Sequence, residues 1–165
     1  MYPYNFIKPR RPIDLKNLSN VYLPDREEAD NLWSSFMREK TQYERRLQNR
    51  IKQSEDVIVK KVQKSLLNTD YTIYPQQMIC YQYKLDIPRK ITRFIQPDIL
   101  LINNDKTRCV IIEIKESAHF NDDVQRENTI ALIRRLYPSA DVKHIYMYSS
   151  EFPNLSETQI IKMMS

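Results

Sequence analysis

The chain has 165 residues, of which 41% are hydrophobic and 28% charged, a balance that suits one globular domain with its own core. It contains no glycine, which excludes the glycine-dependent phosphate loops of nucleotide-binding and kinase folds and the Gly-x-Ser-x-Gly elbow. The net charge is +5, and residues 38–64 hold nine Lys/Arg against four Asp/Glu, an excess that suits a polyanion.

The first third of the chain predicts an arm followed by helix. Residues 1–24 have no sustained period and predict an extended basic arm, interrupted by Pro3, Pro9, Pro12 and Pro24. A helix is predicted over 25–53 with Asp25 as its N-cap, and its apolar face would carry Leu32, Phe36, Tyr43, Leu47 and Ile51. The pattern shifts near Ser54, which would cap a second helix reaching Leu67; one bent helix and two helices both remain open.

Strand signals follow in the middle of the chain. Strands are predicted at 72–74 and 78–87, which are rich in Tyr and Ile, and at 94–102 and 109–114, which are nearly continuous apolar runs. Strands that are apolar on both faces must be covered on both faces, so helices are expected on each side of this sheet.

The last third predicts a helix over 121–137, a strand over 142–148 and a terminal helix over 155–164. We therefore expect one α/β domain over 25–165, with an αβββαβ core at 54–150, a mixed central sheet flanked by helices, and an N-terminal helical extension.

Polar residues interrupt the two apolar strands at matched positions. Asp98 interrupts the run 94–102, and Glu113 and Lys115 interrupt the end of the following run. If Asn103 and Arg108 close the hairpin, Asp98 lies directly opposite Glu113, and alternation along the strand puts Lys115 on the same face as Glu113. An exposed cross-strand ion pair would explain Asp98 and Lys115, but not why all three share one face.

Two facing carboxylates repel each other unless a cation lies between them. Oxygen ligands favour Mg²⁺ or Mn²⁺, so we expect Asp98, Glu113 and the carbonyl of Ile114 to hold the metal. Such a metal would polarise a phosphate and activate water, while Lys115 would orient that water or stabilise developing charge.

Pro97-Asp98, fourteen intervening residues and Glu113-Ile114-Lys115 resemble the motif of the PD-(D/E)xK nuclease superfamily. The order αβββαβ is also similar to its core, and the segment 76–81 is loosely similar to phage junction resolvases and transposon-end-cleaving subunits. The resemblance covers the C-terminal two-thirds of the chain. It implies a restriction-endonuclease-like fold and a Mg²⁺-dependent endonuclease, on DNA rather than RNA.

The resemblance also implies a further acidic residue on the helix before the first strand. Glu55 fits that position best and would be catalytic, with Asp56 and Glu44 as competitors; a helix-capping role explains Glu55 equally well.

Nucleic-acid contacts are expected from basic and polar side chains around this cluster. They would come from the helix before the strands, from the segment after Lys115 and from the following helix: Lys60, Lys61, Lys64, His119, Gln125 and Arg126. An ordinary solvated surface explains each of these singly.

Two other functions remain open: a non-catalytic nucleic-acid-binding or assembly subunit that retains the fold, and an RNA endonuclease. A homodimer, or a subunit of a larger nucleoprotein complex, is compatible with the long helix. No apolar run reaches the length of a membrane span and no secretory signal is present, so an intracellular location and no membrane partner are expected. Cys80 and Cys109 lie in apolar stretches and are expected to be buried free thiols.

Overall fold

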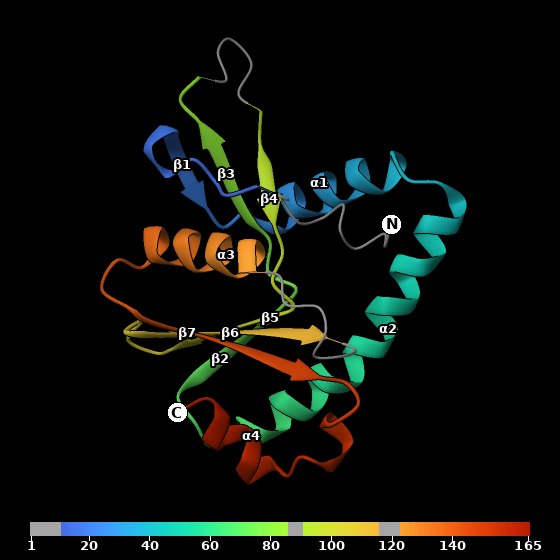
Figure 1. Ribbon diagram of the computed structural model, residues 1–165, viewed down its shortest axis with the longest axis vertical. Coiled ribbons are helices and arrows are strands. Elements are labelled where there is room, and N and C mark those ends of the chain that lie inside the picture. The colour runs from blue at the N-terminus through green and yellow to red at the C-terminus, as the bar shows by residue number, and fades with distance from the viewer. Residues whose placement is uncertain (1–10, 86–90, 116–122) are drawn as a thin grey trace.

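The computed structural model describes residues 11–85, 91–115 and 123–165, with backbone alone at 51–54. It is a mixed α/β structure with two sheets (Figure 1). The strands of one sheet follow the order β2–β5–β6–β7, and those of the other follow β1–β3–β4. The α/β class and the mixed sheet agree with the sequence-based prediction.

The four-stranded sheet is built from β2 (Tyr71–Pro75), β5 (Ile99–Asn103), β6 (Arg108–Lys115) and β7 (Asp141–Tyr148). β2, β5 and β6 are antiparallel neighbours, whereas β7 runs parallel to β6. The parallel pair is joined by α3 (Asp123–Leu136), since a parallel connection must cross the sheet.

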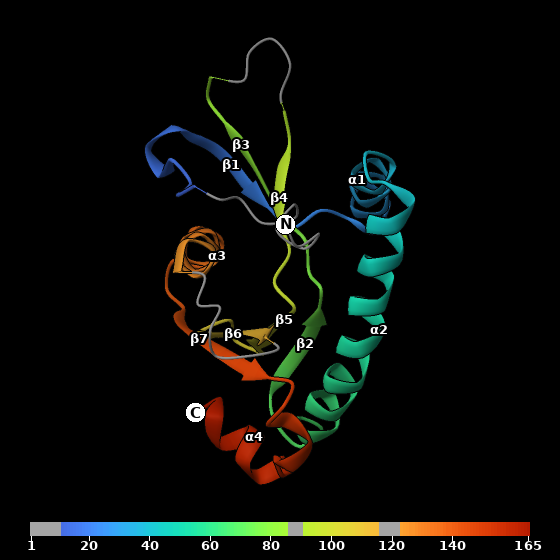
Figure 2. The same cartoon turned by 45° about the vertical axis from the view of Figure 1, so that its right-hand side comes forward.

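Helices cover both faces of this sheet, as its apolar strands require. One face packs against α2 (Gln42–Ser65) and α4 (Glu157–Met163), and the other against α3 and the three-stranded sheet (Figures 1 and 2). The alternation is regular: Ile99 and Ile112 face α2, while Leu100 and Ile111 face α3.

The three-stranded sheet consists of β1 (Leu18–Tyr22), β3 (Ile79–Tyr83) and β4 (Arg93–Ile95). Part of the predicted arm 1–24 is therefore a strand, preceded by a 3-10 turn at Leu15–Asn17. The predicted strand 94–102 is wrong as one element: it divides at Gln96–Asp98, and its two parts belong to different sheets. Pro97 explains the division, because proline has no N–H for a ladder.

The helical region differs from the prediction in where it breaks. α1 spans Arg26–Arg38, and its N-cap is the predicted Asp25, whose side chain accepts from the Glu28 N–H at 2.8 Å. α2 begins after Thr41, which caps it, and runs through Ser54 without interruption. The break at 39–41 changes the direction of the chain, so the predicted single apolar face does not form, and Tyr43 is 73% exposed.

Candidate active site

The hairpin β5–β6 has the register that the sequence predicts. Ile99 pairs with Ile112 and Ile102 with Cys109, and the same register continued by one residue places Asp98 opposite Glu113. Asp98 lies just outside β5, at the point where the chain arrives from β4. The two carboxylates therefore come from adjacent strand ends.

Glu113 and Lys115 lie on the face of β6 that is directed toward α3. Ile112 and Ile114 pack in the cluster under α2, so the alternating residues project to the opposite face. The Lys115 Nζ lies 5.9 Å from the ring centroid of Tyr146, a β7 residue that pairs with Glu113 in the parallel ladder. Lys115 therefore contacts the ladder partner of Glu113, on the side of β6 that alternation assigns to both residues.

The carboxylate of Asp98 is held against β6 by a backbone hydrogen bond. The Ile114 N–H donates to Asp98 Oδ2 at 2.7 Å. The N–H and C=O of one strand residue point toward the same neighbour, so the Ile114 carbonyl is directed toward the end of β5 as well. Asp98 and the Ile114 carbonyl thus lie at one strand end, which suits the predicted metal ligands.

Burial differs sharply across the three predicted groups. Glu113 is 1% exposed, whereas Asp98 and Lys115 are half-buried. An ionised carboxylate loses hydration on burial, and this costs several kcal/mol unless cations or hydrogen bonds compensate. Carboxylate and carbonyl oxygens, such as those of Asp98, Glu113 and Ile114, are the kind of donor that Mg²⁺ or Mn²⁺ prefers.

Glu55 is connected to this strand end through Gln76. The Gln76 Nε2 donates to Glu55 Oε2 at 3.2 Å, and the Gln76 N–H donates to the Asp98 carbonyl at 2.8 Å. Gln76 has a φ of 50°, in the left-handed region that glycine normally occupies, and Gln96 Nε2 bonds its carbonyl at 2.8 Å. Of the competing helix carboxylates, Asp56 is exposed and Glu44 half-buried.

The predicted lysines of α2 do not gather at this strand end. Lys61 is bound to the C-terminal segment, with its Nζ 3.4 Å from the Phe152 carbonyl and 4.8 Å from that ring's centroid. Lys64 lies 3.8 Å from Glu157, and Lys60 is exposed. Lys61 and Lys64 therefore contact the protein's own C-terminal segment.

The prediction for α3 needs one correction. Gln125 is 4% exposed, so its side chain is packed in the interior and is not a surface contact for nucleic acid; the helical period turns it toward the sheet together with Asn128 and Thr129. Arg126, the next residue, is exposed. His119 lies outside the described residues.

Sequence reasoning missed two residues, among those described, that contact the predicted groups. Gln76 follows the strand Tyr71–Pro75 directly, and its position after a strand end was the available signal. Tyr146 alternates with the buried Ile145 and Met147 in β7, and a parallel partner for β6 would have placed it beside Glu113. Such a pairing is non-local, so no short sequence pattern reveals it.

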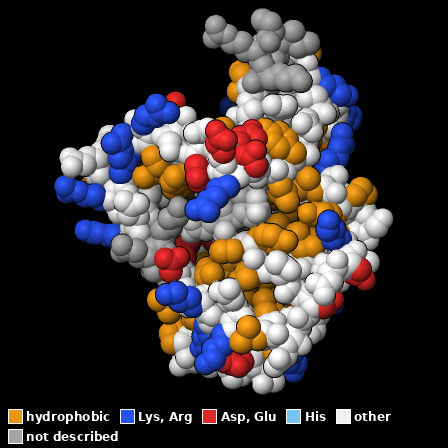
Figure 3. Space-filling view, turned by 180° about the vertical axis from the view of Figure 1, so that it is seen from behind, with side chains coloured by type: hydrophobic (Ala, Val, Ile, Leu, Met, Phe, Trp, Pro, Cys, Tyr) orange, Lys and Arg blue, Asp and Glu red, His pale blue; other side chains and the backbone are white. Residues whose placement is uncertain are grey.

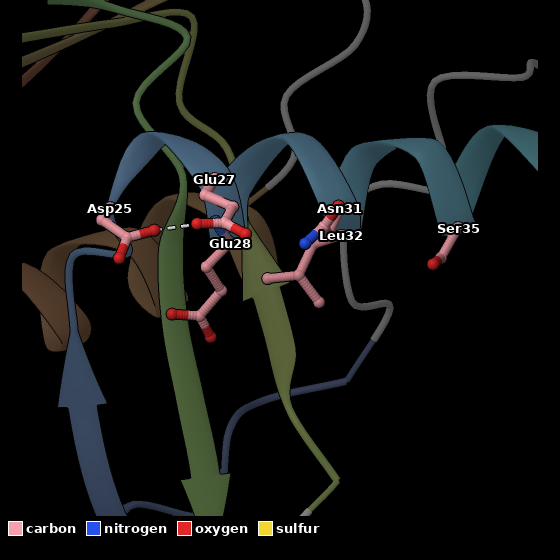
Figure 4. A pocket seen from close by; sticks show the side chains of 6 residues that line it. All are labelled: Asp25, Glu27, Glu28, Asn31, Leu32 and Ser35. Carbon is pink, nitrogen blue, oxygen red and sulfur yellow. Dashed lines mark hydrogen bonds between the residues drawn. The ribbon is translucent and has the colours of Figure 1, made fainter.

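A shallow hollow elsewhere contains three carboxylates but is explained by local structure. It lies on α1 and is lined by Asp25, Glu27, Glu28, Asn31, Leu32 and Ser35 (Figure 4). Asp25 caps the helix, and the Tyr22 hydroxyl donates to the Glu28 carboxylate. Burial and this hydrogen bond raise the pKa of Tyr22 to about 12. Asp98, Glu113 and Lys115 do not line this hollow.

Two features are absent from the part of the chain that the structure describes. No group of three or more His, Cys, Asp or Glu side chains there is arranged to hold a metal ion. Within the same ranges, no helix has the length and apolar character needed to cross a membrane.

Comparison with known proteins finds no match among family models, curated proteins or solved structures.

Proposed function

We propose that this protein is a Mg²⁺- or Mn²⁺-dependent endonuclease that hydrolyses phosphodiester bonds in DNA, with a restriction-endonuclease-like core. The observation that carries the proposal is the bond between the Ile114 N–H and Asp98 Oδ2, in a register that puts Asp98 opposite Glu113. The order α2, β2, β5, β6, α3, β7, with the strands of the sheet in that same order, supports the core.

Each predicted site residue has a proposed role that follows from its chemistry and position. Asp98, Glu113 and the Ile114 carbonyl would hold the metal, which supplies Lewis acidity and a bound water of lowered pKa. Lys115, on the face of Glu113, would donate to the phosphate oxygens as negative charge develops on them. Glu55 would act through Gln76, which fixes the backbone at Asp98, so it is a positioning residue in this arrangement.

Substrate and metal assays on matched variants test the proposal. Plasmid, linear, branched and single-stranded DNA and an RNA of the same sequence are incubated with Mg²⁺, Mn²⁺ or EDTA. We expect metal-dependent cutting that falls at least about 100-fold in Asp98→Asn and Lys115→Ala. The controls are Asp141→Asn and Lys162→Ala, which change exposed residues of β7 and α4.

A second readout is independent of cutting. Mg²⁺ should raise the midpoint of thermal unfolding of the wild type, because a ligand that binds only the folded state stabilises it, and Asp98→Asn should remove this increase. Cutting that persists in EDTA, or that survives both active-site substitutions, would contradict the proposal. Cutting of RNA alone would change the substrate and keep the chemistry.

One observation favours a second candidate, a non-catalytic nucleic-acid-binding or assembly subunit. The hydrogen bond from Ile114 gives Asp98 a structural role at the end of the ladder, which would be useful without catalysis. Binding of nucleic acid with no cutting under either metal would identify this function.

Two active sites would allow both strands of a duplex to be cut in one encounter, so we include a homodimer in the proposal. The mass of the protein in solution, measured by light scattering with and without a duplex, tests it. A monomer in both conditions would contradict the homodimer.

A further inference from the structure

The outward face of α2 carries positively charged side chains near both of its ends. Residues at spacings of three and four share one side of the helix, and six described ones here are exposed. We name this side the outer stripe: Tyr43, Arg46, Arg50, Val57, Lys60 and Lys64. From Arg46 to Lys64 it extends about 27 Å at 1.5 Å per residue.

The composition of the outer stripe differs from that of an ordinary solvated face. It has four cations and no carboxylate, and among the described exposed residues of α2 the only acid is Asp56. Arg46 and Arg50 are four residues apart, a spacing at which like charges destabilise a helix by a few tenths of a kcal/mol. Lys60 and Lys64 have the same spacing, but there the Glu157 carboxylate lies 3.8 Å from Lys64 and offsets part of the repulsion. An anionic polymer along the stripe would relieve this repulsion.

The α1–α2 elbow, at one end of the stripe, has the cations Arg38, Lys40 and Arg45 beside the exposed Glu39 and the half-buried Glu44, a surplus of one positive charge. Arg45 fixes the elbow, because its Nε donates to the Met37 carbonyl at 2.8 Å and its Nη2 to the Arg38 carbonyl at 3.1 Å. Figure 3 shows Lys and Arg side chains projecting along the edge of the molecule that the elbow forms (left). The elbow therefore presents its cations on a fixed backbone.

The stripe faces away from the candidate active site. Glu55, which bonds Gln76 beside Asp98, lies on the opposite side of α2, as do the buried Ile58 and Val62. A phosphate backbone on the stripe would thus be a different segment of nucleic acid from the one at the metal ligands.

We infer that the outer stripe is an anchoring surface for the phosphate backbone of duplex nucleic acid, separate from the cutting site. Guanidinium groups match phosphate oxygens through paired donors, and Tyr43 at the end of the stripe offers a further hydroxyl donor. Tyr43 and Val57 are the only apolar members, too few for the apolar face of a membrane-binding helix. This inference rests on the proposed function only in taking nucleic acid as the partner.

Binding without cutting tests the stripe. A labelled duplex longer than α2, about 30 base pairs at 3.4 Å each, is titrated in EDTA at several KCl concentrations. The variant is Arg46→Gln with Arg50→Gln; Arg45 is left intact because it holds the elbow. The matched control is Arg134→Gln with Arg135→Gln, which removes two exposed cations from α3.

We expect the stripe variant to bind about tenfold more weakly near 0.1 M salt. The slope of log K against log[salt] should be shallower, by an amount that corresponds to about two lost phosphate contacts. The control should bind like the wild type, and Arg46→Lys with Arg50→Lys should recover much of the lost affinity. Circular dichroism and the thermal midpoint establish that each variant is folded.

The remaining outcomes separate the two proposals. Three results would each overturn the anchoring surface. The stripe variant and the control could lose affinity equally, or the wild type could fail to bind duplex. The wild type could also bind phosphatidylserine vesicles or polyglutamate in place of duplex. Metal-dependent cutting with unchanged binding in the stripe variant would overturn the anchoring surface and leave the nuclease intact. Stripe-dependent binding with no cutting under any metal would do the reverse.

Discussion

The face of the four-stranded sheet that α2 and α4 cover is apolar from one end of the hairpin to the other, whereas the face that α3 covers becomes polar where β6 ends. The same two strands supply both faces. Ile112 and Glu113 are neighbours in sequence and are 0% and 1% exposed, yet one packs under α2 and the other lies beside Asp98. The difference shows that burial alone does not distinguish a core residue from a candidate site residue. The two are distinguished by whether the buried side chain is apolar or ionisable.

The largest difference in the free energy of unfolding is expected between substitutions of Ile112 and of Glu113, which represent the two faces. Ile112→Ala should lower the free energy of unfolding by about 2–5 kcal/mol, since it leaves a cavity. Glu113→Gln keeps the volume and removes a negative charge opposite Asp98, so in EDTA the stability should be unchanged or higher. Urea unfolding measures both. A loss in Glu113→Gln as large as that in Ile112→Ala would show that the carboxylate has a structural role.

The face toward α3 also depends on a fully buried asparagine that holds the N-terminal segment. Asn128 is buried; its Oδ1 accepts from the Ile13 N–H at 2.9 Å, and its Nδ2 donates to the Arg11 carbonyl at 3.0 Å. Asn128→Ala should cost about 1–3 kcal/mol, because buried backbone groups lose their partner. Hydrogen exchange at the Ile13 amide should become faster. Unchanged protection there would mean that the arm is held by packing alone.

Raising the pH should weaken the protein through its two buried thiols, one in each sheet. Burial raises the pKa of Cys80 to about 12 and that of Cys109 to about 11, from 9.0 for an exposed thiol. Between about pH 9 and 11 the unfolded chain loses these protons while the folded protein keeps them, so stability is full below pH 9 and falls above it. The loss at pH 10 is on the order of 1 kcal/mol per thiol.

Urea unfolding at pH 8 and pH 10 measures this effect, and Cys80→Ala with Cys109→Ala is the control. The double variant should be less stable at pH 8 and should lose less on going to pH 10. An equal pH dependence in both proteins would assign the effect to other groups.

The smallest effect on the free energy of unfolding is expected at the turn that joins β5 and β6. Lys106 has a φ of 59°, which costs a residue with a Cβ about 1–2 kcal/mol, and the chain has no glycine to place there. Lys106→Gly should therefore stabilise the protein by up to about 1 kcal/mol after the entropic cost of glycine. Lys60→Gly, in the last third of α2, should have the opposite sign and a similar size. Destabilisation by both substitutions would refute the strain at the turn.

The hairpin register could be predicted because its determinants are local. Two apolar runs meet at a short polar turn, where Asn103 Oδ1 accepts the Arg108 N–H at 2.9 Å, and alternation then fixes each side chain. Free, buried cysteines were likewise predicted correctly from their apolar neighbours. The facing of Asp98 and Glu113 followed from this register.

The three-stranded sheet could not be predicted in the same way. β1 pairs with β3 across about sixty residues of chain, with Val21 opposite Tyr81, and its sequence has one fully buried side chain, Leu18. Nothing local specifies such a pairing. The helix break was more accessible: Thr41 followed three residues later by Glu44 is a capping pattern, and it marks the start of α2.

The chain crosses from one sheet to the other within Gln96, Pro97 and Asp98. Three residues span at most about 10 Å, so neither sheet can move far without pulling on this link. Asp98 therefore belongs to the short segment that links the two sheets, and it is also a candidate metal ligand. A tilt of β3 and β4 would act on the Asp98 backbone through this link, so the position of its carboxylate depends on how the two sheets are oriented.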